Sequence, residues 1–108
     1  MNNQKNIVLC GVGGQGTVLA SKLLAAAAMS KDIPVMSAET IGMAQRGGSV
    51  FSHLRMGNDL YSPMIETGTA DLIIGFEPGE TVRMLPYLKT GGHVVVSTRA
   101  VKPVTATP

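Results

Sequence analysis

The fold of this chain is decided by a short stretch near its N-terminus, Asn6-Ile-Val-Leu-Cys-Gly-Val-Gly-Gly-Gln-Gly-Thr17. Residues 6–10 are apolar on both faces of an extended chain, as in a central strand of a parallel sheet. A glycine turn follows, and the Ala-rich segment from Thr17 to about Met29 is predicted to be a helix. A strand, a glycine turn and a helix in this order predict an α/β protein.

The rest of the chain continues this alternation. We expect further strands at residues 34–39, 49–56, 71–77 and 93–98, a helical turn at 40–45, a loop at 60–69, a helix at 80–88, and glycine turns at 57–59 and 91–92. Together they predict a Rossmann-like, doubly wound, mostly parallel sheet in a single domain spanning residues 1–108.

Two features indicate that this domain is incomplete. The predicted helix from Thr17 has only Ser21 and Lys22 as polar interior residues, so we expect a sheet on one side and another element or subunit on the other. Two helices are also too few to cover both faces of four or five strands. We therefore expect a partner to cover the bare face, or the natural domain to continue beyond the C-terminal end.

The amino-acid composition argues against several classes of function. The 108 residues carry 9 Lys+Arg and 7 Asp+Glu, with only 4% aromatic residues and no basic run, which argues against nucleic-acid binding. A single cysteine excludes a disulfide framework and a self-contained iron–sulfur cluster, and the acidic residues lack metal-ligand spacing. Neither a membrane span nor a signal peptide is recognisable, so we expect a cytoplasmic protein.

Individual reactive side chains carry little signal. Cys10 is expected to be a buried small hydrophobe rather than a redox residue. The strand at 49–56 alternates, with Phe51, His53 and Arg55 on one face, and we expect it to be half-exposed. Neither His53 nor His93 has a recognisable partner for catalysis, so the sequence predicts no catalytic residue.

The glycine turn itself carries the strongest functional signal. Gly11, Gly13 and Gly16 match the dinucleotide fingerprint, in which the first glycine allows the turn, the second admits a diphosphate and the third lets helix and strand pack closely. Glu39 lies at the end of the next strand, where a ribose hydroxyl would be bound. This pattern favours an anionic ligand, although a tight turn without a ligand has the same spacing.

A second segment, Gln45-Arg-Gly-Gly-Ser49, offers a cation between flexible glycines. Arg46 can present a planar fork to phosphate or carboxylate; the alternative is a solvated loop arginine. Because this loop follows the carboxyl end of a strand, we expect it at the same edge of the sheet as the first glycine loop.

These two segments carry a family resemblance, together with Ser62-Pro63, Asp71-Leu-Ile-Ile-Gly-Phe-Glu-Pro78 and Gly91-Gly-His-Val-Val-Val-Ser-Thr-Arg99. From residue 7 to 104 the chain resembles the gamma domain of the 2-oxoacid:ferredoxin oxidoreductases, and among these most resembles the beta subunit of the indolepyruvate enzymes. The family domain is usually longer and continues past Arg99, so this chain corresponds to its N-terminal part.

The resemblance implies a hetero-oligomeric enzyme that decarboxylates a 2-oxoacid, such as indolepyruvate or another aryl pyruvate, on thiamine diphosphate. Electrons pass through iron–sulfur clusters to ferredoxin, and the acyl group goes to coenzyme A. Thiamine diphosphate and the clusters are expected on a larger partner subunit, and this chain alone is expected to be inactive. We expect the two loops to contact an anionic group at the subunit interface, with the coenzyme A phosphates as the first candidate and the partner's cofactor region as the second. The residues expected to make these contacts are Gly11, Gly13, Gly14, Gln15, Gly16, Thr17, Arg46, Gly47, Gly48 and Ser49.

Two other functions remain open from the residues alone. GxGxxG and Glu39 also fit an NAD(P)-binding oxidoreductase domain, although no catalytic domain follows. A protein-docking module, in which the glycines merely pack an Ala-rich helix, is the third possibility.

Overall fold

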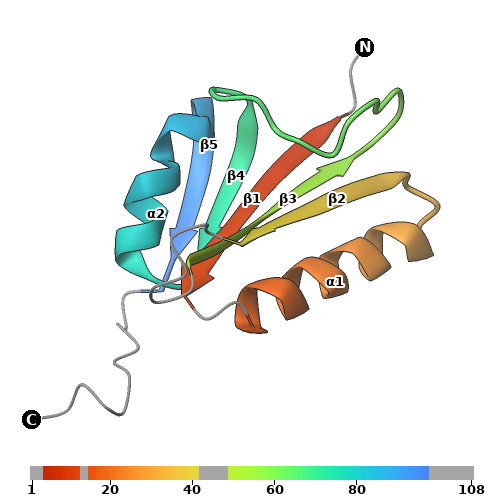
Figure 1. Cartoon of the computed structure of the whole chain (residues 1–108). Coiled ribbons are helices and arrows are strands. Elements are labelled where there is room, and N and C mark those ends of the chain that lie inside the picture. The colour runs from red at the N-terminus through yellow and green to blue at the C-terminus, as the bar shows by residue number, and fades with distance from the viewer. Residues whose placement is uncertain (1–3, 13–14, 42–48, 98–108) are drawn as a thin grey trace, which may run out of the picture.

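A five-stranded sheet with one helix on each face forms the body of the molecule (Figure 1). The computed structural model describes residues 4–12, 15–41 and 49–97. The elements in chain order are β1 (Lys5–Val12), α1 (Gln15–Ser30), β2 (Val35–Ile41), β3 (Ser49–Met56), β4 (Ala70–Gly75), α2 (Pro78–Met84), the 3-10 helix η1 (Leu85–Tyr87) and β5 (Leu88–Val96).

The strand order is β2-β3-β1-β4-β5. β1 pairs parallel to β4 and β4 parallel to β5, whereas β3 pairs antiparallel to both β1 and β2. Four strands therefore run in one direction and only β3 runs against them. With α1 and α2 on opposite faces, this confirms the predicted doubly wound, mostly parallel α/β fold.

The core consists of two apolar layers separated by the sheet. Because successive residues of a strand point to opposite faces, Ile7 and Leu9 of β1 pack on the α1 side, while Val8 and Cys10 pack on the α2 side. All four side chains are buried. The prediction of a central strand that is apolar on both faces is thus confirmed.

Two glycines let the helices approach the sheet. A Cβ on Gly75 of β4 would lie 1.7 Å from Thr81 Oγ1 of α2, and a Cβ on Gly11 of β1 would lie 2.7 Å from Thr17 Oγ1 of α1. The side chains of Thr17 and Thr81 are both buried at these contacts. Any larger residue at either glycine would push a helix away from the strand beneath it.

The expectation that β3 is half-exposed is wrong. Ser52, His53 and Leu54 are all fully buried, so both faces of the strand are covered. The cover on the second face comes from the segment between β3 and β4, where Ile65 is buried and its backbone N–H donates to His53 Nδ1 at 2.8 Å. That segment contains neither helix nor strand between residues 57 and 69, as predicted for 60–69.

Helix α1 begins at Gln15, two residues earlier than expected, and ends at Ser30. Its inner face packs Ala20, Leu24 and Ala25 against the sheet. On the outer face Leu19, Leu23 and Met29 are exposed, and no described element lies over them. The expected second cover of this helix is therefore absent from the described part of the chain.

Strand β5, which spans Leu88–Val96, differs most from the strand expected at residues 93–98. β5 begins at Leu88, because the predicted helix at 80–88 stops as α2 and continues only as the short η1. Gly91 and Gly92 lie inside β5 rather than in a separate turn, at an irregularity where Ala70 pairs with Leu88 but Leu72 pairs with His93. Gly91 adopts φ +85° there, a conformation that glycine tolerates.

Strand β2 also departs slightly from the prediction. It extends to Ile41, so residues 40–41 of the expected helical turn are strand, and the rest of that turn lies outside the described residues.

Candidate functional site

The two glycine segments start from the same edge of the sheet. Val12, the last residue of β1, pairs with Ser49, the first residue of β3, and Val50 pairs with both Gly11 and Ile41. The segment after β1 and the segment between β2 and β3 therefore leave the sheet next to one another, at the carboxyl ends of the parallel strands. This is the edge at which open α/β sheets bind ligands.

Most of the predicted ligand residues lie outside the described part of the chain. This holds for Gly13, Gly14, Arg46, Gly47 and Gly48, and for the side chains of Gln15 and Ser49. The described members of the set are Gly11, Gly16 and Thr17.

Gly11 and Gly16 have different roles from those that the fingerprint predicts. Gly11 lies in β1, not in a turn, and it provides the close helix–strand contact through Thr17. Gly16 lies in the first turn of α1, where an added Cβ would meet no described atom within 4 Å. Close packing therefore depends on the first glycine of the motif rather than on the third.

The start of α1 supplies backbone donors at this edge. The first four N–H groups of a helix have no partner within the helix, and they carry a partial positive charge. Among the described residues of α1 these belong to Gln15, Gly16 and Thr17. Because the Thr17 side chain is buried against β1, its contribution to a ligand is restricted to its backbone amide.

Glu39 is not placed as a dinucleotide-binding carboxylate would be. β2 does not pair with β1, because β3 lies between them, with Glu39 opposite Ser52 and Ser52 opposite Leu9. Two strand spacings, about 10 Å, therefore separate Glu39 from β1. The sheet order removes the second element of the NAD fingerprint.

The reactive side chains of the interior are held in neutral forms. Burial raises the pKa of the Cys10 thiol above its ordinary value; a hydrogen bond with Thr81 opposes this rise, and nearby Glu80 and Glu77 add to it. Burial also lowers the pKa of His53, whose Nδ1 accepts from Ile65. Cys10 is fully buried, which confirms its expected role as a core residue.

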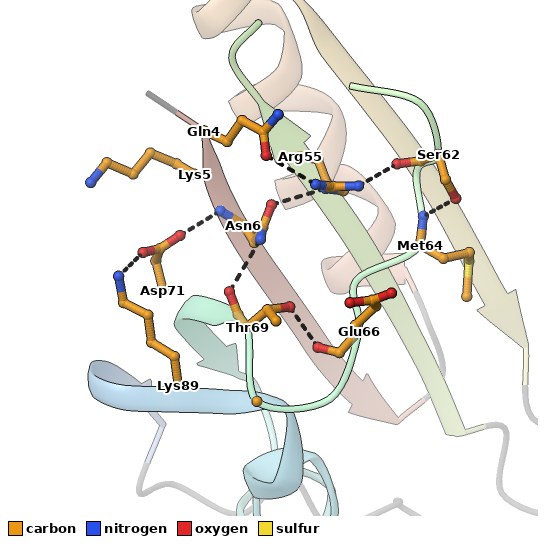
Figure 2. A pocket seen from close by; sticks show the side chains of 11 residues that line it. Gln4, Lys5, Asn6, Arg55, Ser62, Met64, Glu66, Thr69, Asp71 and Lys89 are labelled. Carbon is orange, nitrogen blue, oxygen red and sulfur yellow. Dashed lines mark hydrogen bonds and ion pairs between the residues drawn. The ribbon is translucent and has the colours of Figure 1, made fainter. Parts of the chain in front are cut away.

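A second polar site, which the sequence did not reveal, lies at the opposite edge of the sheet (Figure 2). This cleft, here called the amino-edge cleft, has a volume of about 710 Å³. Its walls come from the starts of β1, β4 and β5, the end of β3 and the segment 57–69. It is lined by Gln4, Lys5, Asn6, Arg55, Ser62, Met64, Glu66, Gly68, Thr69, Asp71 and Lys89.

Arg55 is the central side chain of this cleft (Figure 2). Its Nε donates to Asn6 Oδ1 at 3.0 Å, Nη1 donates to the Ser62 carbonyl at 2.9 Å, and Nη2 donates to Gln4 Oε1 at 3.2 Å. Asn6 is held in turn, since its side-chain amide donates to the Thr69 carbonyl at 3.1 Å. The guanidinium is thereby fixed between β1 and the segment 57–69.

The other side of the cleft carries an ion pair between Lys89 and Asp71 (Figure 2). Burial alone would raise the pKa of Asp71, but hydrogen bonds from Lys89 and from the Asn6 backbone N–H outweigh burial and lower it. Asp71 is therefore a stable carboxylate whose charge is matched by Lys89.

Within residues 4–12, 15–41 and 49–97, no group of three or more His, Cys, Asp and Glu side chains is arranged to hold a metal ion. No helix in this part of the chain is long and apolar enough to cross a membrane.

The described elements form an α/β domain in which a glycine-rich sequence lies between the central strand β1 and helix α1. The family model for pyruvate ferredoxin/flavodoxin oxidoreductases matches residues 6–108. The chain belongs to this family. Over 99 residues, 92% of the chain, it is 46% identical to the indolepyruvate oxidoreductase subunit IorB of Pyrococcus horikoshii.

The chain spans about half the length of the curated relatives that it matches, including 49% of the Pyrococcus horikoshii subunit. The resemblance to the oxidoreductase gamma domain and its indolepyruvate branch is thus confirmed for the matched region.

Solved structures show the same fold. The gamma subunit of a keto/oxoacid ferredoxin oxidoreductase from Geobacter sulfurreducens matches 91% of the chain and 56% of its own length, with a TM-score of 0.68 and 23% identity. A 2-oxoglutarate:ferredoxin oxidoreductase from Magnetococcus marinus, solved with 2-oxoglutarate, coenzyme A and succinyl-CoA, matches 95% of the chain and 18% of its own, with a TM-score of 0.76 and 21% identity.

Proposed function

We propose that this chain is the N-terminal part of a gamma-type domain in a 2-oxoacid:ferredoxin oxidoreductase, with indolepyruvate or a related aryl pyruvate as the oxoacid. The 46% identity to indolepyruvate oxidoreductase subunits supports this assignment. In the proposal a larger partner subunit holds thiamine diphosphate and the iron–sulfur clusters and passes electrons to ferredoxin. The assembly is placed in the cytoplasm.

Within that assembly, the glycine edge contributes an anion-binding surface for coenzyme A. The observation that carries this proposal is the pairing of Val12 with Ser49, which places the described residues flanking the two glycine segments side by side, near the N-terminus of α1. Backbone amides at a helix start favour phosphate, and Arg46 adds a cation from the second segment. The contacts are assigned to the residues from Gly11 to Thr17 and from Arg46 to Ser49.

Coenzyme A binding by the complex that contains this chain tests the proposal. We expect coenzyme A to raise the melting temperature of the complex, and we expect Arg46→Ala to reduce that shift and to raise the KM for coenzyme A. Arg83→Ala is the matched control, because Arg83 is an exposed arginine on α2 whose ion pair with Glu80 is long, at 4.0 Å.

Other outcomes would contradict this function in distinct ways. Stabilisation by NAD alone would favour a dinucleotide-binding domain, against which the position of Glu39 argues. If Arg46→Ala prevents assembly and leaves coenzyme A affinity unchanged, the glycine edge is a docking surface rather than a ligand site.

A further inference from the structure

The amino-edge cleft holds two opposite charges that do not neutralise one another. Glu66 and Arg55 both line it, yet they form no ion pair within 4.0 Å. Lys89 and Asp71 form a pair of their own, and Lys5 lies close enough to Asp71 to help lower its pKa. Within the described residues, the lining side chains without an ion pair are therefore Arg55, Glu66 and Lys5, and Lys5 lies on the Asp71 side of the cleft.

The Arg55 guanidinium is prepared for a carboxylate. Its three hydrogen-bond acceptors, on Asn6, Ser62 and Gln4, are all neutral oxygens, and no carboxylate of the described residues forms an ion pair with it. A guanidinium has five N–H donors, so one on each terminal nitrogen lacks a partner among the described residues. These two donors are free to bind a carboxylate, and the three existing bonds hold the group in place beforehand.

The Glu66 side chain offers the complementary charge. Its backbone carbonyl accepts from the Thr69 hydroxyl at 2.6 Å, which fixes the chain at this point, but its carboxylate has no hydrogen-bond or ion-pair partner within the described part of the chain. Apart from Met64, the neighbouring lining is polar or glycine. The cleft thus favours a small, polar ligand that carries both charges.

We propose that the amino-edge cleft binds a zwitterionic small molecule of the α-amino acid class. Arg55 receives the carboxylate and Glu66 receives the ammonium group. A cleft of about 710 Å³ lies within the usual size range of small-molecule sites. This site is separate from the glycine edge, which lies at the opposite ends of the strands, and it does not depend on the proposed function there.

Three matched probes test this assignment on the full, isotope-labelled chain by NMR. L-Serine carries both charges, 3-hydroxypropionate lacks the amine, and L-serinamide lacks the carboxylate. We expect serine to cause saturable shifts of the backbone amides of Asn6, Met64 and Thr69, and we expect each analogue to bind at least about tenfold more weakly.

Two variants assign the roles within the cleft. Glu66→Gln is expected to weaken serine binding about tenfold and to leave 3-hydroxypropionate binding unchanged. Glu39→Gln, at an exposed carboxylate on β2, is the matched control and is expected to change neither. The proposal is overturned if serine causes no shifts at tens of millimolar, if 3-hydroxypropionate binds as tightly as serine, or if Glu66→Gln binds serine as the unmodified chain does.

Discussion

Val12 lies directly opposite Ser49 in the antiparallel ladder between β1 and β3. These residues are 37 positions apart in sequence. Val12 is the last residue of the strand before the first glycine-rich segment, and Ser49 is the first residue of the strand that follows the second one. The pairing depends on the reversed direction of β3, because only an antiparallel strand starts at the edge where β1 ends. The reversed direction of β3 is thus what places the end of β1 beside the start of β3.

The two described glycines of the loop motif are expected to respond oppositely to alanine. Gly11→Ala should destabilise the fold by about 1–3 kcal/mol, because its Cβ would lie 2.7 Å from Thr17 Oγ1. Gly16→Ala should stabilise α1 by up to about 1 kcal/mol, because the position is helical and open. Urea unfolding of both variants measures this difference.

Gly16→Ala also separates packing from ligand binding. If backbone approach at the glycine edge serves coenzyme A, this variant should gain stability and lose coenzyme A affinity in the assembled enzyme. Loss of stability in Gly16→Ala would contradict the open environment described for this residue.

Because His53 is buried and its pKa is lowered, we expect the free energy of unfolding to fall in mild acid. Burial lowers its pKa in the folded state, so the unfolded chain, with an ordinary pKa of about 6.5, takes up the proton first. The free energy of unfolding should be insensitive to His53 above about pH 6.5 and should fall as the pH drops below it, until the folded pKa is reached.

Chemical unfolding between pH 8 and 5 measures this effect. His53→Gln should flatten the pH dependence, although it will lower stability overall, and His93→Gln is the control because His93 is exposed. An unchanged profile in His53→Gln would show that another group causes the acid sensitivity.

Arg55→Lys tests the hydrogen bonds that hold the segment 57–69. A lysine cannot reproduce the three donors that reach Asn6, Ser62 and Gln4. We expect faster hydrogen exchange across residues 57–69, with protection in β1 and β4 retained. Arg83→Lys, at a largely exposed side chain on α2, should leave exchange unchanged; equal protection in both variants would contradict the proposed role of Arg55.

The exposed valines of β5 predict self-association of the isolated chain. Val94, Val95 and Val96 are all exposed, and β5 is the last strand of the described sheet. We expect sedimentation velocity to show concentration-dependent association, which Val95→Lys reduces. Val82→Lys, at a similarly exposed valine on α2, should not reduce it; a strictly monomeric chain at high concentration would contradict the prediction.

Local sequence patterns predicted where the strands and helices lie along the chain, but they did not predict which strands pair with one another in the sheet. The apolar run at residues 6–10 and the alternation at 49–56 identify strands because they depend on residues adjacent in sequence. The insertion of β3 between β1 and β2 depends on long-range pairing, which leaves no local trace. The burial of His53 was missed for the same reason, since its cover comes from Ile65 in a segment without regular structure.

The two candidate sites differ in the same way, since one depends on contiguous motifs and the other on long-range pairing. The glycine edge is visible in sequence because its motifs are contiguous. The amino-edge cleft is assembled from five separate segments, and Arg55 is brought to Asn6 only by the β1–β3 register. The one available signal is the presence of polar residues at the starts of three strands, at Lys5, Asp71 and Lys89.

Among the described strands, β5 has a neighbour on one side only, so its other side has no partner strand within the described sheet. Such a border can pair with an extended segment of another chain, because the backbone N–H groups donate and the C=O groups accept hydrogen bonds whatever the sequence of the partner. A partner's extended segment and a second copy of this chain would therefore compete for the same border.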